Sequence, residues 1–309
     1  MRIGVFTVDI NGARTTVPEL LAASRDAEQR GFATAWVPQL PWSLDPLAAQ
    51  ALAATATERI ELGTAVVPTY PRHPLTLAQE ALTVQAASNG RFVLGIGASH
   101  PVIIESMYGL GYASPAAHTA EYAQVLRAAA DADGHVAFTG KHFAVNAMFE
   151  VPAGKPFPIL IAALGPRMLE AAGSVADGTV TTWCDERAIG EHIVPRVTAA
   201  AARAGRPPPR VVCCLSIAVV KDVDAAKREV GPLFDGFRRI PAYQRMIERA
   251  SSPQPVDIAI IGDEGTVRAR LAALEAAGVT DFCAAPLAIG PEPASVRKRT
   301  LDLLQSVVS

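Results

Sequence analysis

The sequence has few cysteines, little charge imbalance and no long apolar run, and each of these shortages excludes a class of protein. Its four cysteines (Cys184, Cys213, Cys214 and Cys283) are irregularly spaced and lack metal-ligand spacing, so we expect reduced, buried thiols. With 28 basic and 30 acidic residues, the net charge of −2 gives no general attraction to nucleic acid or anionic membranes. No apolar run reaches the length that spans a bilayer. We therefore expect neither a nucleic-acid partner nor a membrane partner.

Targeting signals and several catalytic signatures are also missing. Residues 1–10 (MRIGVFTVDI) lead directly into a predicted strand and lack the regions of a signal peptide, which predicts a cytoplasmic protein. There is no nucleophile elbow, phosphate-binding loop or paired-carboxylate motif. His192 lacks zinc-protease spacing, and His118, His135 and His142 fall in helical or insertion segments where we expect them to be solvated. Without a lysine or carboxylate pair at strand ends, a cofactor-free lyase or hydrolase is disfavoured.

Half of the 309 residues are apolar, and they fall into short β-type runs that alternate with longer alanine-rich stretches. Eight strands alternating with helices imply a parallel sheet, and a closed (β/α)8 TIM barrel fits this count best. A doubly wound open sheet is the runner-up. Because such barrels can exceed about 250 residues as one unit, residues 1–309 are predicted to form a single domain. The predicted strands are residues 2–9, 33–37, 60–67, 92–96, 158–162, 178–182, 210–220 and 281–284, with a hairpin insertion at 136–150.

The helices predicted between these strands have recognisable ends. Proline near the first turn and glycine just past the last mark several of them. The predicted helices are residues 18–30, 46–56, 75–88, 115–132, 166–175, 186–204, 224–250 (with breaks), 266–277 and 294–307.

The turn after the fourth strand is the most informative candidate site, since barrel enzymes place their chemistry at the C-terminal ends of strands. Gly95 and Gly97 could let a flat ligand approach the backbone, or they could only relieve crowding. Ser99 and His100 then place hydrogen-bonding groups at the mouth, although a lone histidine often merely caps a loop. The turn is not a dinucleotide fingerprint, because a third glycine is missing and Pro101 follows.

The turn after the fifth strand is a candidate anion site. Pro166 begins a helix and leaves the next N–H groups free, while small residues before it expose those donors. Arg167 adds positive charge, so the turn could hold a phosphate. An ordinary helix start with a surface arginine is an equal alternative.

Other strand ends carry weaker candidates. Asp9 could hold a proton or orient a substrate, or it could form the turn before Asn11. Arg72 could bind an anion, whereas His73 more simply caps the following helix. Trp183 could form the wall of an apolar pocket, as buried tryptophans also do in ordinary cores.

Three ordered motifs resemble the luciferase-like monooxygenase superfamily, and within it the actinobacterial branch that uses the deazaflavin coenzyme F420. The motifs are residues 59–74 (RIELGTAVVPTYPRHP), 88–100 (SNGRFVLGIGASH) and 162–173 (AALGPRMLEAAG) with Asp177-Gly178 following, and the later segments 260–263 and 277–279 fit as well. The resemblance runs nearly end to end. It is less specific for the cofactor, because flavin-using members share the barrel.

The resemblance implies that an isoalloxazine-like ring lies at the C-terminal mouth of the barrel. A bulge at Ala65-Val66, often with a cis non-proline peptide in the family, would support the ring from behind. The turn at Ala98-Ser99-His100 would lie beside the ring and its side chain. The cofactor's phosphate or tail would meet Ala163, Leu164, Gly165 and Pro166.

One departure from the family bears on the reaction. Sugar-phosphate dehydrogenases of this superfamily have an acidic residue and a histidine after the second strand, where this sequence has Gln39 and Leu40. Gln39 can still hydrogen-bond the cofactor or substrate, but Leu40 cannot shuttle a proton. This favours reduction of an activated double bond or imine over oxidation of a sugar.

The sequence as a whole thus predicts an oxidoreductase that transfers a hydride between coenzyme F420 and a small organic substrate. His100 is the leading proton donor or cofactor anchor, and Asp9 is the weaker candidate. Alternatives are an FMN-dependent monooxygenase and a catalytically inactive deazaflavin-binding protein. Apolar helices such as residues 75–88 could support a homodimer, as in other members of the family.

Overall fold

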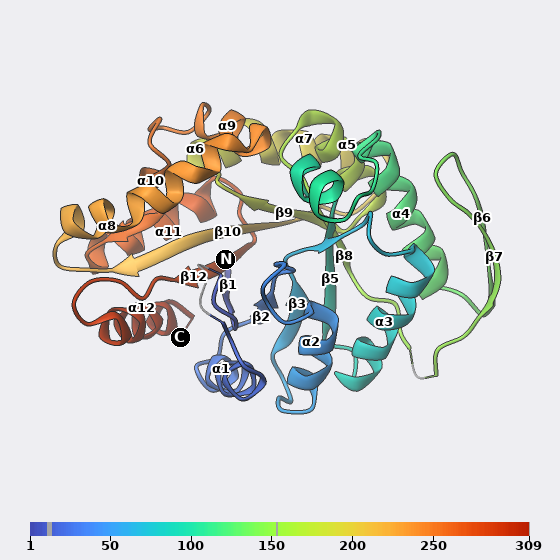
Figure 1. Ribbon diagram of the computed structural model, residues 1–309, viewed down its shortest axis with the longest axis horizontal. Coiled ribbons are helices and arrows are strands. Elements are labelled where there is room, and N and C mark those ends of the chain that lie inside the picture. The colour runs from blue at the N-terminus through green and yellow to red at the C-terminus, as the bar shows by residue number, and fades with distance from the viewer. Residues whose placement is uncertain (11–13, 153, 309) are drawn as a thin grey trace.

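The computed structural model describes residues 1–10, 14–152 and 154–308, and its centre is a closed ring of parallel strands (Figure 1). The closure confirms the predicted (β/α)8 barrel and contradicts the open-sheet alternative, because the last strand of the ring pairs with the first. Around the barrel the strands follow the order β1 (Arg2–Phe6), β2 (Thr34–Val37), β3 (Glu61–Thr64), β5 (Phe92–Gly97), β8 (Ile159–Ala162), β9 (Gly178–Thr182), β10 (Arg210–Val219) and β12 (Asp281–Pro286).

Two short strands extend the barrel sheet and were not predicted as separate elements. The predicted strand 60–67 is divided, since β3 ends at Thr64 and β4 (Val67–Pro68) begins after a cis peptide between Ala65 and Val66. β11 (Ile260–Gly262) pairs in parallel with the C-terminal part of β10. Its three residues are too few to show a strand periodicity in the sequence.

Helices cover the outside of the barrel, and several begin with proline at the first or second position as the sequence predicts. The predicted helix 186–204 is broken into shorter pieces. In the segment 224–250 a new helix begins at Pro241 as expected, but the break expected at Gly231-Pro232 is wrong, because one helix runs through both residues. The helices are α1 (Val17–Gln29), α2 (Pro46–Ala54), α3 (Pro74–Ala87), α4 (Pro115–Ala130), α5 (Pro166–Val175), α6 (Glu186–Ala188), α7 (Val194–Arg203), α8 (Val223–Asp235), α9 (Pro241–Ile247), α10 (Pro255–Ile258), α11 (Glu264–Ala276) and α12 (Pro293–Val308), with π-helical turns η1 (Val102–Met107) and η2 (Ile189–Ile193) and a 3-10 turn η3 (Gly236–Arg239).

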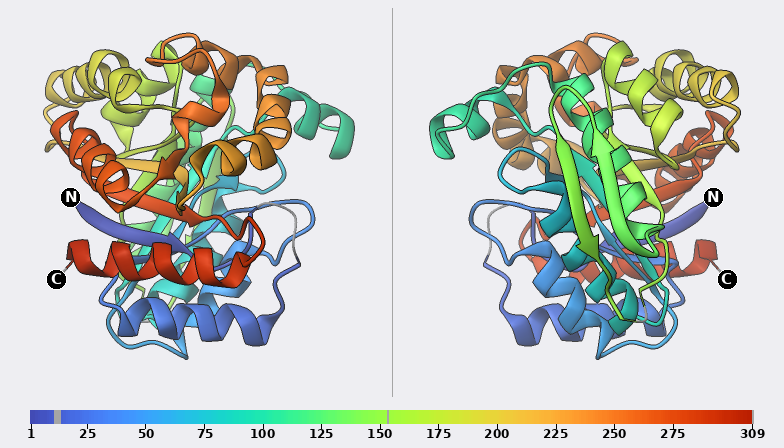
Figure 2. Two further views of the ribbon diagram at one scale, coloured as in Figure 1. Left: turned by 90° about the vertical axis from the view of Figure 1, so that its left-hand side faces the viewer. Right: turned by 90° about the vertical axis from the view of Figure 1, so that its right-hand side faces the viewer.

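The predicted hairpin insertion is confirmed as β6 (Gly134–Thr139) and β7 (Ala144–Phe149), an antiparallel ribbon outside the barrel. It lies against α4, as Figure 2 shows in its right-hand view. The Glu121 carboxylate on α4 accepts hydrogen bonds from three backbone N–H groups of the hairpin turn, at Lys141, His142 and Phe143. This contact ties the insertion to the barrel.

The expectation that His118 and His142 are solvated is wrong. Both are half-buried where the hairpin turn meets α4, and the His118 ring stacks on Tyr70 with centroids 4.1 Å apart. Burial, together with the neighbouring His142, lowers the pKa of His118 to about 4. His118 is therefore a neutral packing residue near pH 7. His135 is exposed, as expected.

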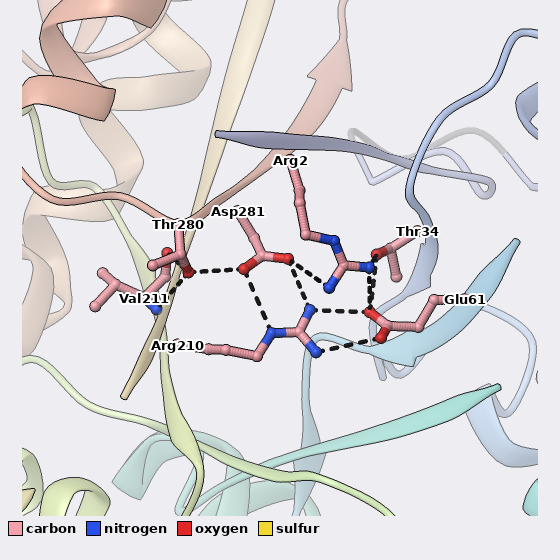
Figure 3. A network of polar contacts seen from close by, with 7 residues as sticks. All are labelled: Arg2, Thr34, Glu61, Arg210, Val211, Thr280 and Asp281. Carbon is pink, nitrogen blue, oxygen red and sulfur yellow. Dashed lines mark hydrogen bonds and ion pairs between the residues drawn. The ribbon is translucent and has the colours of Figure 1, made fainter. Parts of the chain in front are cut away.

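A network of charges closes the N-terminal end of the barrel (Figure 3). The Arg210 guanidinium at the start of β10 donates to Glu61 at 2.9 Å and to Asp281 at 2.7 Å, which are the first residues of β3 and β12. Arg2 pairs with the same two carboxylates. Burial alone would lower the pKa of Arg210, but its hydrogen bonds to Glu61 and Asp281 outweigh burial and raise it. One cation thus joins strands on different sides of the ring.

Arg210→Met should lower the free energy of unfolding by about 3 kcal/mol, because it leaves part-buried carboxylates without their main counter-charge. Arg203→Met makes the same chemical change in the Arg203–Glu170 pair, whose side chains are both more than half exposed. That control should cost less than about 1 kcal/mol. Urea unfolding of both variants measures the difference, and equal losses would contradict a structural role for Arg210.

The pKa of His118 predicts a pH dependence of stability. The unfolded chain takes up this proton near the ordinary value of 6.5 and the folded chain only near 4, so acid favours the unfolded chain. The free energy of unfolding should therefore fall as the pH drops from about 6.5 to about 4, and His118→Phe should flatten this slope. His135→Phe, on the exposed face of the hairpin, is the control. Unfolding measured across this range would contradict the prediction if both variants kept the wild-type slope.

Candidate active site

A cavity of about 1140 Å³ opens at the C-terminal ends of the barrel strands. Pockets for a single small ligand occupy about 300–1,000 Å³, so this one is at or above the upper end of that range. Its walls come from turns that follow β2, β4, β5, β8 and β9, and from the η3–α9 segment that follows β10. Every residue expected to contact a cofactor lines it, namely Gln39, Ala65, Val66, Ala98, Ser99, His100, Ala163, Leu164, Gly165 and Pro166.

The bulge at Ala65 and Val66 forms one wall, and it explains the two glycines of β5. A Cβ atom added to Gly95 would lie 2.1 Å from the carbonyl oxygen of Thr64, and one added to Gly97 would lie 2.9 Å from a methyl group of Val66. These glycines therefore make room for the protein's own bulge. The idea that they admit a flat ligand is corrected for Gly95, which does not line the cavity.

The turn after β5 brings His100 into the cavity. Ser99 has a left-handed backbone (φ 61°), and its carbonyl oxygen accepts a hydrogen bond of 3.0 Å from the Tyr112 hydroxyl. The His100 ring is half-buried, and its Nε2 lies 3.1 Å from the Tyr243 hydroxyl. Burial lowers the pKa of His100 below its ordinary value of 6.5, so the imidazole is neutral near pH 7.

Tyr243 is the residue of this site that sequence reasoning missed. It lies on α9, 143 positions from His100 in the sequence. No local pattern links two residues at that distance. Only the folding of the η3–α9 segment over the barrel brings them together.

The start of α5 faces the cavity with free hydrogen-bond donors. Gly165 is the N-cap and Pro166 follows, and among the described residues no side-chain hydrogen bond caps this helix end. The His192 Nε2–H donates to the Leu164 carbonyl oxygen at 2.8 Å and so holds this loop. Arg167 lies exposed at the rim and forms no ion pair with the residues described. The helix end and the arginine together favour a bound anion.

The charged side chains that line the cavity are positive. Arg167 and Arg245 line it, and both are exposed at its rim. No aspartate or glutamate belongs to the lining within the described ranges. A neutral or anionic ligand is therefore favoured over a cationic one, which would find no counter-charge.

Gln39 carries an unsatisfied polar atom at the cavity wall. Its Oε1 is buried and has no hydrogen-bond partner in the part of the chain that the structure describes. Such an atom costs about 1–3 kcal/mol unless a donor reaches it. A bound molecule with an N–H or O–H group at this wall would supply that donor.

A cluster of aromatic side chains forms another part of the cavity wall. Trp183 lines the cavity, and its ring contacts Phe237 at 4.4 Å, Phe234 at 5.3 Å and Tyr243 at 6.3 Å between centroids. Three of these four rings come from the segment after β10. The wall therefore suits a flat or apolar molecule.

Asp9 is not brought together with His100. It lines a separate hollow of about 330 Å³, where its backbone N–H donates to the Thr15 hydroxyl. Asp9 is thus outside the lining of the larger cavity, and a catalytic role for it stays a prediction. Asn11, the other candidate after the first strand, lies outside the described residues.

The candidates after the third strand have structural partners. Arg72, which was considered as an anion-binding residue, forms ion pairs with Asp45 and Glu80. These carboxylates neutralise its positive charge. His73 Nδ1 accepts a hydrogen bond from the Leu75 N–H and caps α3, as the simpler interpretation predicts.

The cysteines and the other potential metal ligands do not form a metal centre in the part of the chain that the structure describes. All four cysteines are free and buried. Within residues 1–10, 14–152 and 154–308, no group of three or more histidine, cysteine or acidic side chains could hold a metal ion. None of the helices described there is long and apolar enough to cross a bilayer.

Two curated relatives are similar over most of the chain. A protein of Mycobacterium tuberculosis, named provisionally as a coenzyme F420-dependent oxidoreductase, is 27% identical and aligns with 85% of this chain and 88% of its own. The 5,10-methylenetetrahydromethanopterin reductase of Methanolobus tindarius is 31% identical over 65% of this chain and 61% of its own.

Solved structures share the fold. An F420-dependent secondary alcohol dehydrogenase with an F420–acetone adduct superposes with a TM-score of 0.81 at 18% identity, covering 99% of this chain and 97% of that one. The FMN-bound oxygenating component of a 3,6-diketocamphane monooxygenase of Pseudomonas putida gives 0.77 at 17% identity, with 100% and 97% covered. The luciferase-like monooxygenase model matches residues 1–281, and the chain therefore belongs to the luciferase-like monooxygenase family of enzymes.

Proposed function

We propose that this enzyme is an oxidoreductase that uses the deazaflavin coenzyme F420 and a small organic substrate, and that it reduces an activated double bond or an imine. The names of its relatives support the cofactor. The observation that carries the proposal is a large cavity at the C-terminal mouth of the barrel, whose lining includes anion-binding groups at the start of α5 and a cluster of aromatic rings.

The residues of the cavity fit a deazaflavin. The cofactor's phosphate would meet the N–H groups at the start of α5 and Arg167. The buried Gln39 Oε1, which has no partner among the described residues, would accept a hydrogen bond from the ring system. Ala65 and Val66 would form the apolar surface behind the ring. When bound, the reduced deazaflavin supplies a hydride-transfer capacity that side chains lack.

The chain's own residues would position the substrate and stabilise the charge that develops on it. The aromatic wall around Trp183 excludes water and holds an apolar molecule. The neutral imidazole of His100 provides a hydrogen bond at the mouth. No carboxylate lines the described part of the cavity, and Leu40 stands where the sugar-phosphate dehydrogenases of the superfamily have a histidine, so the acid–base pair of those enzymes is absent here. Reduction therefore suits this lining better.

Binding of reduced and oxidised F420 and of FMN to the purified chain tests the cofactor assignment. We expect F420 to bind with a micromolar or lower Kd (about −8 kcal/mol), and FMN more weakly. Fluorescence titration measures both. Tighter FMN binding with oxygen consumption would favour the monooxygenase alternative, and F420 binding without turnover of any enone or imine would favour the inactive binding protein.

Gln39→Leu should weaken F420 binding about tenfold (about 1.4 kcal/mol), because the ligand loses an acceptor for one hydrogen bond. The same change should leave the free energy of unfolding of the free enzyme equal or higher, since Oε1 lacks a partner there among the described residues. Gln79→Leu, at an exposed position of α3, is the matched control and should bind F420 normally. Unchanged binding by Gln39→Leu would remove this residue from the proposed site.

A further inference from the structure

Tyr243 and His100 come from separate segments of the cavity lining and are in contact there. His100 belongs to the turn after β5, whereas Tyr243 belongs to α9, and both line the cavity. Their rings are nearly perpendicular (80°) with centroids 4.9 Å apart, and the hydroxyl lies 3.1 Å from Nε2. The Tyr243 ring also packs on Phe237 and Trp183. Apolar contacts thus hold the Tyr243 ring, and its hydroxyl makes a polar contact with His100.

The chemistry of the two groups decides which one donates. A phenol is a better hydrogen-bond donor than a neutral imidazole N–H, and an imidazole nitrogen is a better acceptor than a phenol oxygen. Among the described residues, no other acceptor lies within hydrogen-bond distance of the Tyr243 hydroxyl. If His100 donated instead, the phenolic proton would have no acceptor there. The Tyr243 O–H therefore donates to Nε2.

Both groups stay neutral near pH 7. Burial lowers the pKa of His100, and burial raises the pKa of Tyr243, with the nearby thiols of Cys214 and Cys184 adding to the increase. A neutral imidazole carries one proton, so an acceptor role for Nε2 places that proton on Nδ1.

The Nδ1 atom is available to a ligand. No backbone or side-chain group described forms a hydrogen bond with it, and it is not one of the buried atoms that are sealed off without a partner. His100 itself lines the cavity. Its Nδ1–H is therefore a neutral donor, without a partner among the described residues, on a side chain that lines the cavity.

We propose that Tyr243 is a positioning residue that holds His100 in the Nδ1–H tautomer, so that Nδ1–H donates to a hydrogen-bond acceptor atom of the substrate. The role of Nδ1–H toward a substrate rests on the proposed function, whereas the tautomer does not. It also defines the substrate class, because negative charge must develop on an acceptor atom during reduction. A carbonyl oxygen conjugated to the reduced double bond meets that condition, whereas a fully alkylated iminium ion has no acceptor and would carry a charge that this cavity does not balance.

Nitrogen-15 NMR of the full chain with labelled histidine tests the tautomer without any cofactor. The chain has six histidines, and His100→Asn identifies the His100 signals by their loss. We expect wild-type His100 to show a protonated Nδ1 and an acceptor-type Nε2. Tyr243→Phe keeps the ring packing and removes only the hydroxyl, so it should shift His100 toward the Nε2–H tautomer. A wild-type Nε2–H tautomer, or no change in Tyr243→Phe, would overturn the proposal.

Turnover supplies the second readout. With reduced F420 and cyclohex-2-en-1-one as the probe, Tyr243→Phe should lower kcat about 10- to 100-fold while the Kd for F420 stays within about twofold. Tyr70→Phe is the control, since its hydroxyl bonds to the Ala113 carbonyl outside the cavity lining, and it should keep wild-type kcat. An unchanged kcat in Tyr243→Phe would contradict the positioning role. Failure of the wild-type chain to bind F420 would instead contradict the proposed function, and the NMR result would be unaffected by it.

Discussion

Arg210 joins carboxylates on separate strands of the ring and so closes the N-terminal end of the barrel. The rest of the barrel depends on this closed end. Glu61, Asp281, Arg2 and Arg210 all stand at the beginnings of their strands, so the charges gather at one end. Above them the interior is filled by Trp36, which occupies the space left by the missing side chains of Gly4 and Gly63. The lower layers are filled in this way, and the cavity lies toward the C-terminal ends of the strands.

The two sides of the cavity are built in different ways. One side consists of short turns after β4, β5 and β8, whose backbone geometry is held by close packing, as between Val66 and Gly97. The other side consists of aromatic side chains from the segment between β10 and β11, including Phe237 and Tyr243. In the proposed function the first side would hold the cofactor and the second would shape the space for the substrate. Changes in the second side would then alter substrate choice with little effect on the fold.

Several histidines of the chain have structural rather than chemical roles. His73 caps α3, His192 holds the Leu164 carbonyl, and His118 packs on Tyr70. Each has a partner or a packing role that accounts for it. His100 differs because its ring reaches the cavity and one of its nitrogen atoms bonds only to a tyrosine from a distant segment. Its chemical role is therefore decided by its surroundings and not by its residue type.

The sequence by itself determined the alternation of strands and helices, the barrel, the hairpin insertion and the turns at Ala65, His100 and Gly165 that line the cavity. These follow from local patterns, since hydrophobic periodicity, proline and glycine act within a few residues. Tertiary structure alone decided that Gly95 admits a neighbouring strand, that Asp9 lies in a separate hollow and that Tyr243 meets His100. Those outcomes depend on contacts between segments far apart in the chain, and no local pattern encodes which side chain will fill a given space.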